Sequence, residues 1–261
     1  MTATLPQLAT HRVLGVDVQA IDTDTLLSLT GQIIEAGDRR IIANHNLHSV
    51  YLYHHDAPIR RFYKLADYVF IDGIPLVYMG MLLGLPLRPR HKITSIDWLP
   101  LLLAAGVPRG WRTFLLGGRA TTVTWAAAEL TRRIPGVQLE TAPGYFDATP
   151  GSPGAEAVLK RINDFRPHLL CVGMGMPRQE HWIADHFERL EANVVFNLGG
   201  FLELLSGELP TPPRWTARAN LEWLYRLVTR PRRVWRRYLL EPWALAPLAL
   251  RDLSGRIRGS G

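Results

Sequence analysis

The sequence contains a single cysteine, Cys171, among its 261 residues. One thiol excludes a disulfide framework and a metal site built from several cysteines. No apolar run reaches the roughly 18 residues of a membrane-spanning helix, and the first residues do not form the pattern of a secretory signal peptide. The nine histidines show no metal-ligand spacing. We therefore expect neither a metal nor another cofactor, and a reducing compartment.

The remaining composition is that of an ordinary globular protein. Hydrophobic residues make up 47% of the chain and charged residues 20%, which excludes a disordered chain because enough apolar surface is present to form a core. The length exceeds the roughly 150 residues of an average domain. It predicts one large domain, or one domain with an appendage.

The positive charge is concentrated in the last fifth of the chain. Residues 211–261 contain 11 arginines and 3 acidic residues, a net charge of +8, whereas residues 1–210 carry −1. Four of the eight tryptophans lie in the same segment. Arginine beside tryptophan is typical of helices that lie on membranes. We therefore predict a core at residues 1–207 and a basic, helical, membrane-associating appendage at residues 208–261.

Short apolar runs alternate with longer helical patterns along the core. The predicted strands are residues 40–43, 68–71, 113–116, 168–172 and 193–197. The predicted helices are residues 49–65, 74–83, 95–105, 121–134, 154–165 and 177–190, with appendage helices at 219–229 and 234–240 and a short apolar stretch at 242–250. Alternating βα units predict an α/β fold with a mostly parallel, doubly wound (Rossmann-like) sheet. Residues 11–21 predict an edge strand, followed by a capped helix.

Each predicted strand is followed by polar residues or glycine. These segments are Asn44–Asn46, Asp72-Gly73, Gly117–Arg119, Gly173–Glu180 and Asn197–Gly200. Ligands of open α/β sheets bind beyond the carboxyl ends of the strands. The pattern therefore predicts a binding site at this one edge. The glycines could bring backbone N–H groups against a phosphate, or they could simply form turns.

Asp72 has two interpretations. A carboxylate at a strand end beside an apolar run is placed to act as a general base, whereas the residues alone slightly favour a cap for the helix that begins near residue 74. The apolar run at residues 74–87 is favoured as a core helix over a groove for a lipid. Asp22 and Asp24 match a metal-binding D-x-D motif, yet a helix cap explains them better.

Taken together, these motifs resemble the WecG/TagA/CpsF family of bacterial glycosyltransferases, from about residue 13 to residue 237. The matching stretches are Asn44–Asn46, Ala66-Asp67 with Ile71–Gly73, Ile93–Asp97, Phe114–Gly118, Gly144–Phe146, Gly173–Trp182, Gly199–Gly207, Pro213–Trp215 and Glu222–Leu227. Their order and spacing, and the closing EWLYRL signature, make the resemblance specific.

The resemblance implies an inverting, metal-independent transfer of a sugar from a UDP-sugar to a polyprenyl-diphosphate-linked saccharide. The product would belong to an exopolysaccharide or another polymer of the cell envelope. The protein would be peripheral, on the cytoplasmic face of the bacterial inner membrane, where it meets an anionic surface. Nucleic acid is not an expected partner, and a homo-oligomer is compatible with this assignment.

The resemblance also assigns roles to individual residues. The base falls on Asp72. Substrate-binding positions fall on Asn44, Asn46, Lys92, Gln179, Glu203, Arg214 and Arg226, and we add Arg218, Gly117, Gly118 and Gly173 from their places in the chain. Three of these residues depart from the family pattern, since Asn44, Lys92 and Glu203 replace a more usual threonine, arginine and aspartate.

Two other classes of function stay open at this stage. A Rossmann-type oxidoreductase would also alternate βα units with glycine turns, although the full dinucleotide fingerprint is missing. A nucleic-acid-binding protein would explain the basic appendage, although arginine and tryptophan on apolar helices fit a membrane better.

Overall fold

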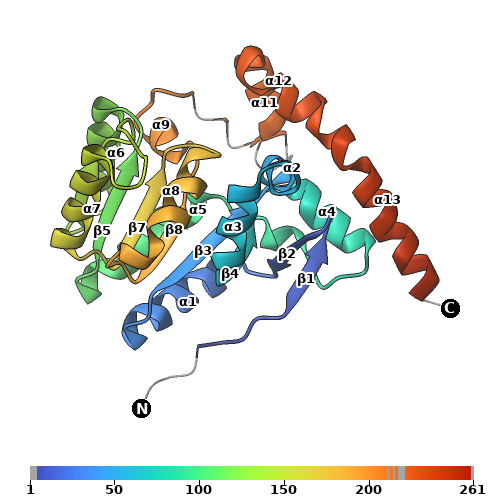
Figure 1. Ribbon diagram of the computed structural model, residues 1–261, viewed down its shortest axis with the longest axis horizontal. Helices are drawn as coiled ribbons and strands as arrows, with labels where there is room; N and C mark the ends of the chain where they lie inside the picture. Colours follow the sequence, from blue (N-terminus) through green and yellow to red (C-terminus); the bar gives the residue numbers. More distant parts are fainter. Residues whose placement is uncertain (1–4, 211, 214, 217–220, 260–261) are drawn as a thin grey trace.

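The computed structural model describes residues 5–210, 212–213, 215–216 and 221–259 (Figure 1). Its centre is a six-stranded parallel sheet with the order β4-β3-β8-β7-β5-β6. The strands are β3 (Arg40–His45), β4 (Tyr68–Ile71), β5 (Arg112–Gly117), β6 (Gln138–Ala142), β7 (Leu169–Gly173) and β8 (Val194–Asn197). All five predicted strands lie in this sheet. The edge strand β6 was not predicted, because its sequence QLETA is half-exposed and not an apolar run.

Helices cover both faces of the sheet, which confirms the doubly wound architecture (Figure 1). One layer comprises α1 (Thr23–Ala36), α5 (Ser95–Gly106), α6 (Ala120–Arg133) and α9 (Phe201–Leu205). The other comprises α2 (Leu47–His55), α3 (Ala57–Leu65), α7 (Pro153–Phe165) and α8 (Arg178–His186). Side chains alternate along each strand, so in β3 Ile41 packs on the second layer and Ile42 on the first.

Two predictions near the N-terminus were wrong in detail. The expected edge strand at residues 11–21 is a separate antiparallel hairpin of β1 (Thr10–Val13) and β2 (Val16–Gln19). Leu14 and Gly15 connect the two strands, and both have positive φ angles. Two such residues in succession form the tight turn that is favoured in β-hairpins. The single helix expected at residues 49–65 is α2 followed by α3. Asp56 separates them, because its side chain accepts a hydrogen bond from the backbone N–H of Ile59 and caps α3.

The helix after β4 bears on whether residues 74–87 form a core helix or a groove for a lipid. In α4 (Ile74–Leu82), Leu76 and Val77 are fully buried in the core. The opposite side of α4 exposes Tyr78 and Leu82. The core interpretation therefore holds for the inner face of α4.

Helices make up most of the described residues beyond 221. They are α11 (Glu222–Thr229), α12 (Pro231–Leu239) and α13 (Glu241–Gly259), so the last helix is much longer than the stretch predicted at 242–250. Figure 1 shows α13 beside α2 at one end of the sheet. Leu245 is only 2% exposed within the core cluster, and Asp252 accepts a 2.7 Å hydrogen bond from the Leu14 N–H. None of the helices in the described ranges combines the length and hydropathy needed to cross a bilayer.

Candidate active site

Asp72 directly follows β4, at the carboxyl edge of the sheet. Its backbone N–H donates to the His45 carbonyl at the end of β3 (2.8 Å). A Cβ atom on Gly73 would lie 3.2 Å from the Asn46 Cβ atom, so a larger residue there would require a shift of a few tenths of an ångström. The residue that caps α4 is Gly73, and no side chain caps that helix. The interpretation of Asp72 as the helix cap was therefore wrong.

Basic residues of the core and of the C-terminal helices lie around Asp72. The Lys92 backbone bridges to Ile71, one residue before Asp72, and its Nζ atom is 2.5 Å from Oε2 of Glu222 in α11. From α12, Arg237 Nη2 donates to Asn46 Oδ1 (3.2 Å). The appendage is thus joined to the core at the ends of β3 and β4.

The pKa of Asp72 is raised from its ordinary value of 3.8 to about 6. Burial is the largest cause, since desolvation disfavours the charged carboxylate. Arg226 and Arg237 oppose this rise, and the negative charge of Glu222 adds to it. A carboxylate with this pKa can accept a proton near neutral pH.

Asn44 lies in β3 and Asn46 directly follows it, and the neighbouring strand β4 ends just before Asp72. The Asn44 amide is buried and donates to the Asn197 backbone carbonyl (2.7 Å). Asn46 caps α2 through a hydrogen bond from the Ser49 N–H to its Oδ1 atom. Asn46 Oδ1 therefore serves both the cap and Arg237, and Asn44 links β3 to β8.

Gln179 is fully buried in the first turn of α8. Its Oε1 atom accepts hydrogen bonds from the backbone N–H groups of Gly175 (3.2 Å) and Gly199 (3.1 Å). In this arrangement the side chain joins the loops that follow β7 and β8. Gly173 ends β7 at the first of these loops.

Gly117 and Gly118 lie further from Asp72. Three strands separate β5 from β4, a distance of roughly 19 Å at about 4.8 Å per strand. A Cβ atom on Gly117 would lie 2.1 Å from the Gly173 carbonyl oxygen, and the Gly118 N–H donates to that same oxygen (3.3 Å). These glycines permit close packing of the ends of β5 and β7. Both strand ends lie away from Asp72 and the basic residues around it.

The other predicted positions are distributed as follows. Glu203 lies in the first turn of α9, after the β8 loop, and its backbone carbonyl accepts from the Leu209 N–H (2.9 Å). Arg226 lies in α11, within electrostatic range of Asp72. Arg214 and Arg218 lie outside the described residues.

Four residues at this edge were not predicted individually as site residues, although Glu180 and Asn197 fall in segments predicted to lie there. They are Glu180, Asn197, Glu222 and Arg237. Asn197 had a visible signal, since it directly follows an apolar strand. Arg237 had none, because it is one of eight arginines between residues 214 and 237.

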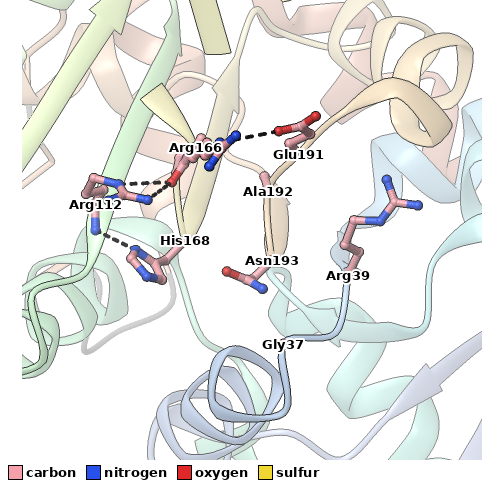
Figure 2. A pocket seen from close by; sticks show the side chains of 9 residues that line it. Gly37, Arg39, Arg112, Arg166, His168, Glu191, Ala192 and Asn193 are labelled. Atoms are coloured by element: carbon pink, nitrogen blue, oxygen red, sulfur yellow. Dashed lines mark hydrogen bonds and ion pairs between the residues drawn. The ribbon is translucent and has the colours of Figure 1, made fainter. Parts of the chain in front are cut away.

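A cavity of about 400 Å³ lies at the opposite, amino edge of the sheet (Figure 2). Three arginines line it, but two of them donate to the carbonyl groups that end helical segments. Arg112 donates to the Arg166 carbonyl oxygen (2.7 Å), and Arg39 donates to that of Leu190 (3.0 Å). None of the predicted site residues lines this cavity.

Comparison with known proteins identifies relatives of this chain and its family. The chain is 33% identical to the N-acetylglucosaminyldiphosphoundecaprenol N-acetyl-beta-D-mannosaminyltransferase of Staphylococcus aureus (strain NCTC 8325 / PS 47) over 171 residues. It is 32% identical to the protein of the same name from strain MRSA252. Each match covers 66% of this chain and 65% of the relative's length. The model of the glycosyl transferase WecG/TagA/CpsF family matches residues 11–259, and the chain belongs to this family.

Proposed function

We propose that this protein is an inverting glycosyltransferase that moves a sugar from a UDP-sugar to a polyprenyl-diphosphate-linked saccharide. The observation that carries the proposal is the Asp72 cluster, in which a carboxylate with a raised pKa faces cations of the core and the appendage. Membership of the family supports this activity over a Rossmann-type oxidoreductase.

Asp72 is the proposed general base. An acceptor hydroxyl is a weak nucleophile at neutral pH, and a carboxylate with a pKa of about 6 is largely ionised there. Asp72 takes the hydroxyl proton while the oxygen attacks the anomeric carbon on the face opposite UDP. The C–O bond to UDP breaks as the new glycosidic bond forms, so the anomeric configuration inverts.

The basic residues around Asp72 are proposed to stabilise the departing diphosphate. Negative charge develops on UDP in the transition state, and fixed cations in a partly desolvated site stabilise it strongly. Arg226 and Arg237 are the cations with the largest effect on Asp72. Lys92 is paired with Glu222, so a bound diphosphate would compete with Glu222 for the Lys92 ammonium group.

The names of the relatives suggest the substrates to try first. Those proteins transfer N-acetylmannosamine to an undecaprenyl-diphosphate-linked N-acetylglucosamine, according to their names. The direct test supplies the protein with a short-chain polyprenyl-diphosphate N-acetylglucosamine and a panel of UDP-sugars, with product mass as the readout. We expect transfer from one donor. Absence of any glycosylated product across the panel would contradict the proposal.

We also propose that residues 208–261 hold the protein on the anionic cytoplasmic face of the bacterial inner membrane. Trp243 in α13 is 77% exposed, and exposed tryptophan beside arginine suits a lipid interface. Replacing Trp235 and Trp243 by glutamine should reduce co-sedimentation with vesicles that contain phosphatidylglycerol. Trp125→Gln is the matched control, because Trp125 is 67% exposed on α6 of the core. Equal binding of both variants would contradict the membrane role.

A further inference from the structure

Glu180 is a fully buried carboxyl group one residue after Gln179. Its Oε1 atom accepts hydrogen bonds from the Gln179 Nε2 atom (2.6 Å) and the Asn197 Nδ2 atom (2.9 Å). Its Oε2 atom is buried and has no hydrogen-bond partner. A buried polar atom without a hydrogen-bond partner destabilises the fold. The buried Oε2 atom therefore needs a physical cause.

The two residues that Glu180 holds connect three strand ends. Gln179 joins the Gly175 N–H in the loop after β7 to the Gly199 N–H in the loop after β8. Asn197 Oδ1 accepts from the Asn44 backbone N–H in β3 (3.1 Å). One carboxyl oxygen therefore fixes both amide side chains, and these fix the backbone at the middle of the carboxyl edge.

The surroundings of Glu180 favour the uncharged acid. Both of its hydrogen-bond donors are neutral amides, and burial raises the pKa of its carboxyl group. A buried carboxylate without a cation is expensive, and such a group protonates instead. The proton then occupies Oε2, and Oε1 remains an acceptor for the two amides.

We propose that Glu180 is a positioning residue of the donor site, which holds Gln179 and Asn197 so that the loops after β7 and β8 keep the shape that receives the UDP-sugar. This inference rests on the proposed transferase activity. The Glu180 side chain is fully buried, so its proposed action runs through Gln179 and Asn197 and not through contact with the substrate.

The test compares Glu180→Gln with Glu180→Ala. Glutamine keeps an oxygen acceptor and resembles the neutral acid, whereas alanine removes the acceptor. For Glu180→Ala we expect the Kd of UDP and the KM of the UDP-sugar to rise about tenfold or more, since small displacements of binding groups cost up to about 10²-fold. We expect a much smaller change in kcat. Glu180→Gln should retain wild-type constants, as should the exposed control Glu188→Ala.

Several outcomes would overturn the inference. Wild-type donor constants in Glu180→Ala would do so, as would a Glu180→Gln variant that is as impaired as Glu180→Ala. If Glu180→Ala does not fold, Glu180→Asp applies the same test, because its shorter side chain cannot reach both amides. Amide hydrogen exchange at Gly175 and Gly199 should accelerate in Glu180→Ala and not in Glu180→Gln. A wild-type protein that neither binds UDP nor transfers a sugar would refute the proposed function. The hydrogen exchange at Gly175 and Gly199 would still test whether Glu180 positions the two loops.

Discussion

Basic side chains lie at both the amino edge and the carboxyl edge of the sheet, but they interact with different groups at each edge. At the amino edge, Arg39 and Arg112 line the cavity of about 400 Å³ and donate to backbone carbonyls. At the carboxyl edge, Arg226 and Arg237 lower the pKa of Asp72 against the opposing effect of burial. The first arrangement stabilises helix ends, and the second places charge where a reaction would need it.

The comparison shows that a cavity and positive charge do not by themselves identify an active site. Two of the arginines that line the amino-edge cavity already donate to backbone carbonyl groups. The carboxyl edge combines a desolvated acid, cations and buried amides at the ends of three adjacent strands, β4, β3 and β8. This edge is also where ligands of open α/β sheets bind.

The largest expected effect is that of Asp72→Asn. Loss of a general base lowers the rate by about 10²–10⁴-fold, and we expect kcat to fall within that range while the melting temperature does not fall. Asp67→Asn is the matched control, because Asp67 precedes the opposite end of β4 and accepts a hydrogen bond from the Ile41 N–H. Wild-type turnover by Asp72→Asn would exclude the base assignment.

Arg237→Gln tests the cations of the carboxyl edge. Loss of one charge that stabilises the leaving group should lower kcat about 10²-fold. Arg236→Gln, on the same helix, is the control, because Arg236 is exposed and lies over the Trp235 ring. Initial rates at saturating donor provide the measurement. Equal rates for the two variants would remove Arg237 from the proposed mechanism.

The smallest effect on activity is expected at the amino edge. Arg112→Gln removes two hydrogen bonds to the Arg166 carbonyl, and each such bond contributes about 1 kcal/mol. We expect a modest loss in the free energy of unfolding in urea, with kcat and KM unchanged. A large rise in KM for the UDP-sugar would instead place donor binding in the amino-edge cavity.

Much of the fold could be predicted because apolar runs and glycine turns mark parallel strands locally. The strand at residues 68–71 matches β4 at both ends. The edge strand β6 was missed because an edge strand needs no continuous apolar run. The hairpin of β1 and β2 was interpreted as an edge strand because pairing partners depend on the whole chain.

The candidate site could be predicted where polar residues directly follow or end a strand, as at Asp72 and Asn44, which the structure places at the carboxyl edge. It was not predictable where distant segments meet. The pairing of Lys92 with Glu222 joins residues 130 positions apart, and no local pattern indicates it. Gln179 matched a motif, but only the structure places its side chain inward, where Glu180 holds it.

The pH dependence of kcat/KM tests most directly whether Asp72 is the base. The proposed mechanism needs the ionised carboxylate, whose pKa is about 6, so kcat/KM should fall tenfold per pH unit below that value as the carboxylate takes up a proton. We expect this acid limb in the wild-type protein and its absence from the residual activity of Asp72→Asn. A wild-type profile that stays level down to about pH 4.5, or an identical acid limb in Asp72→Asn, would contradict the assignment.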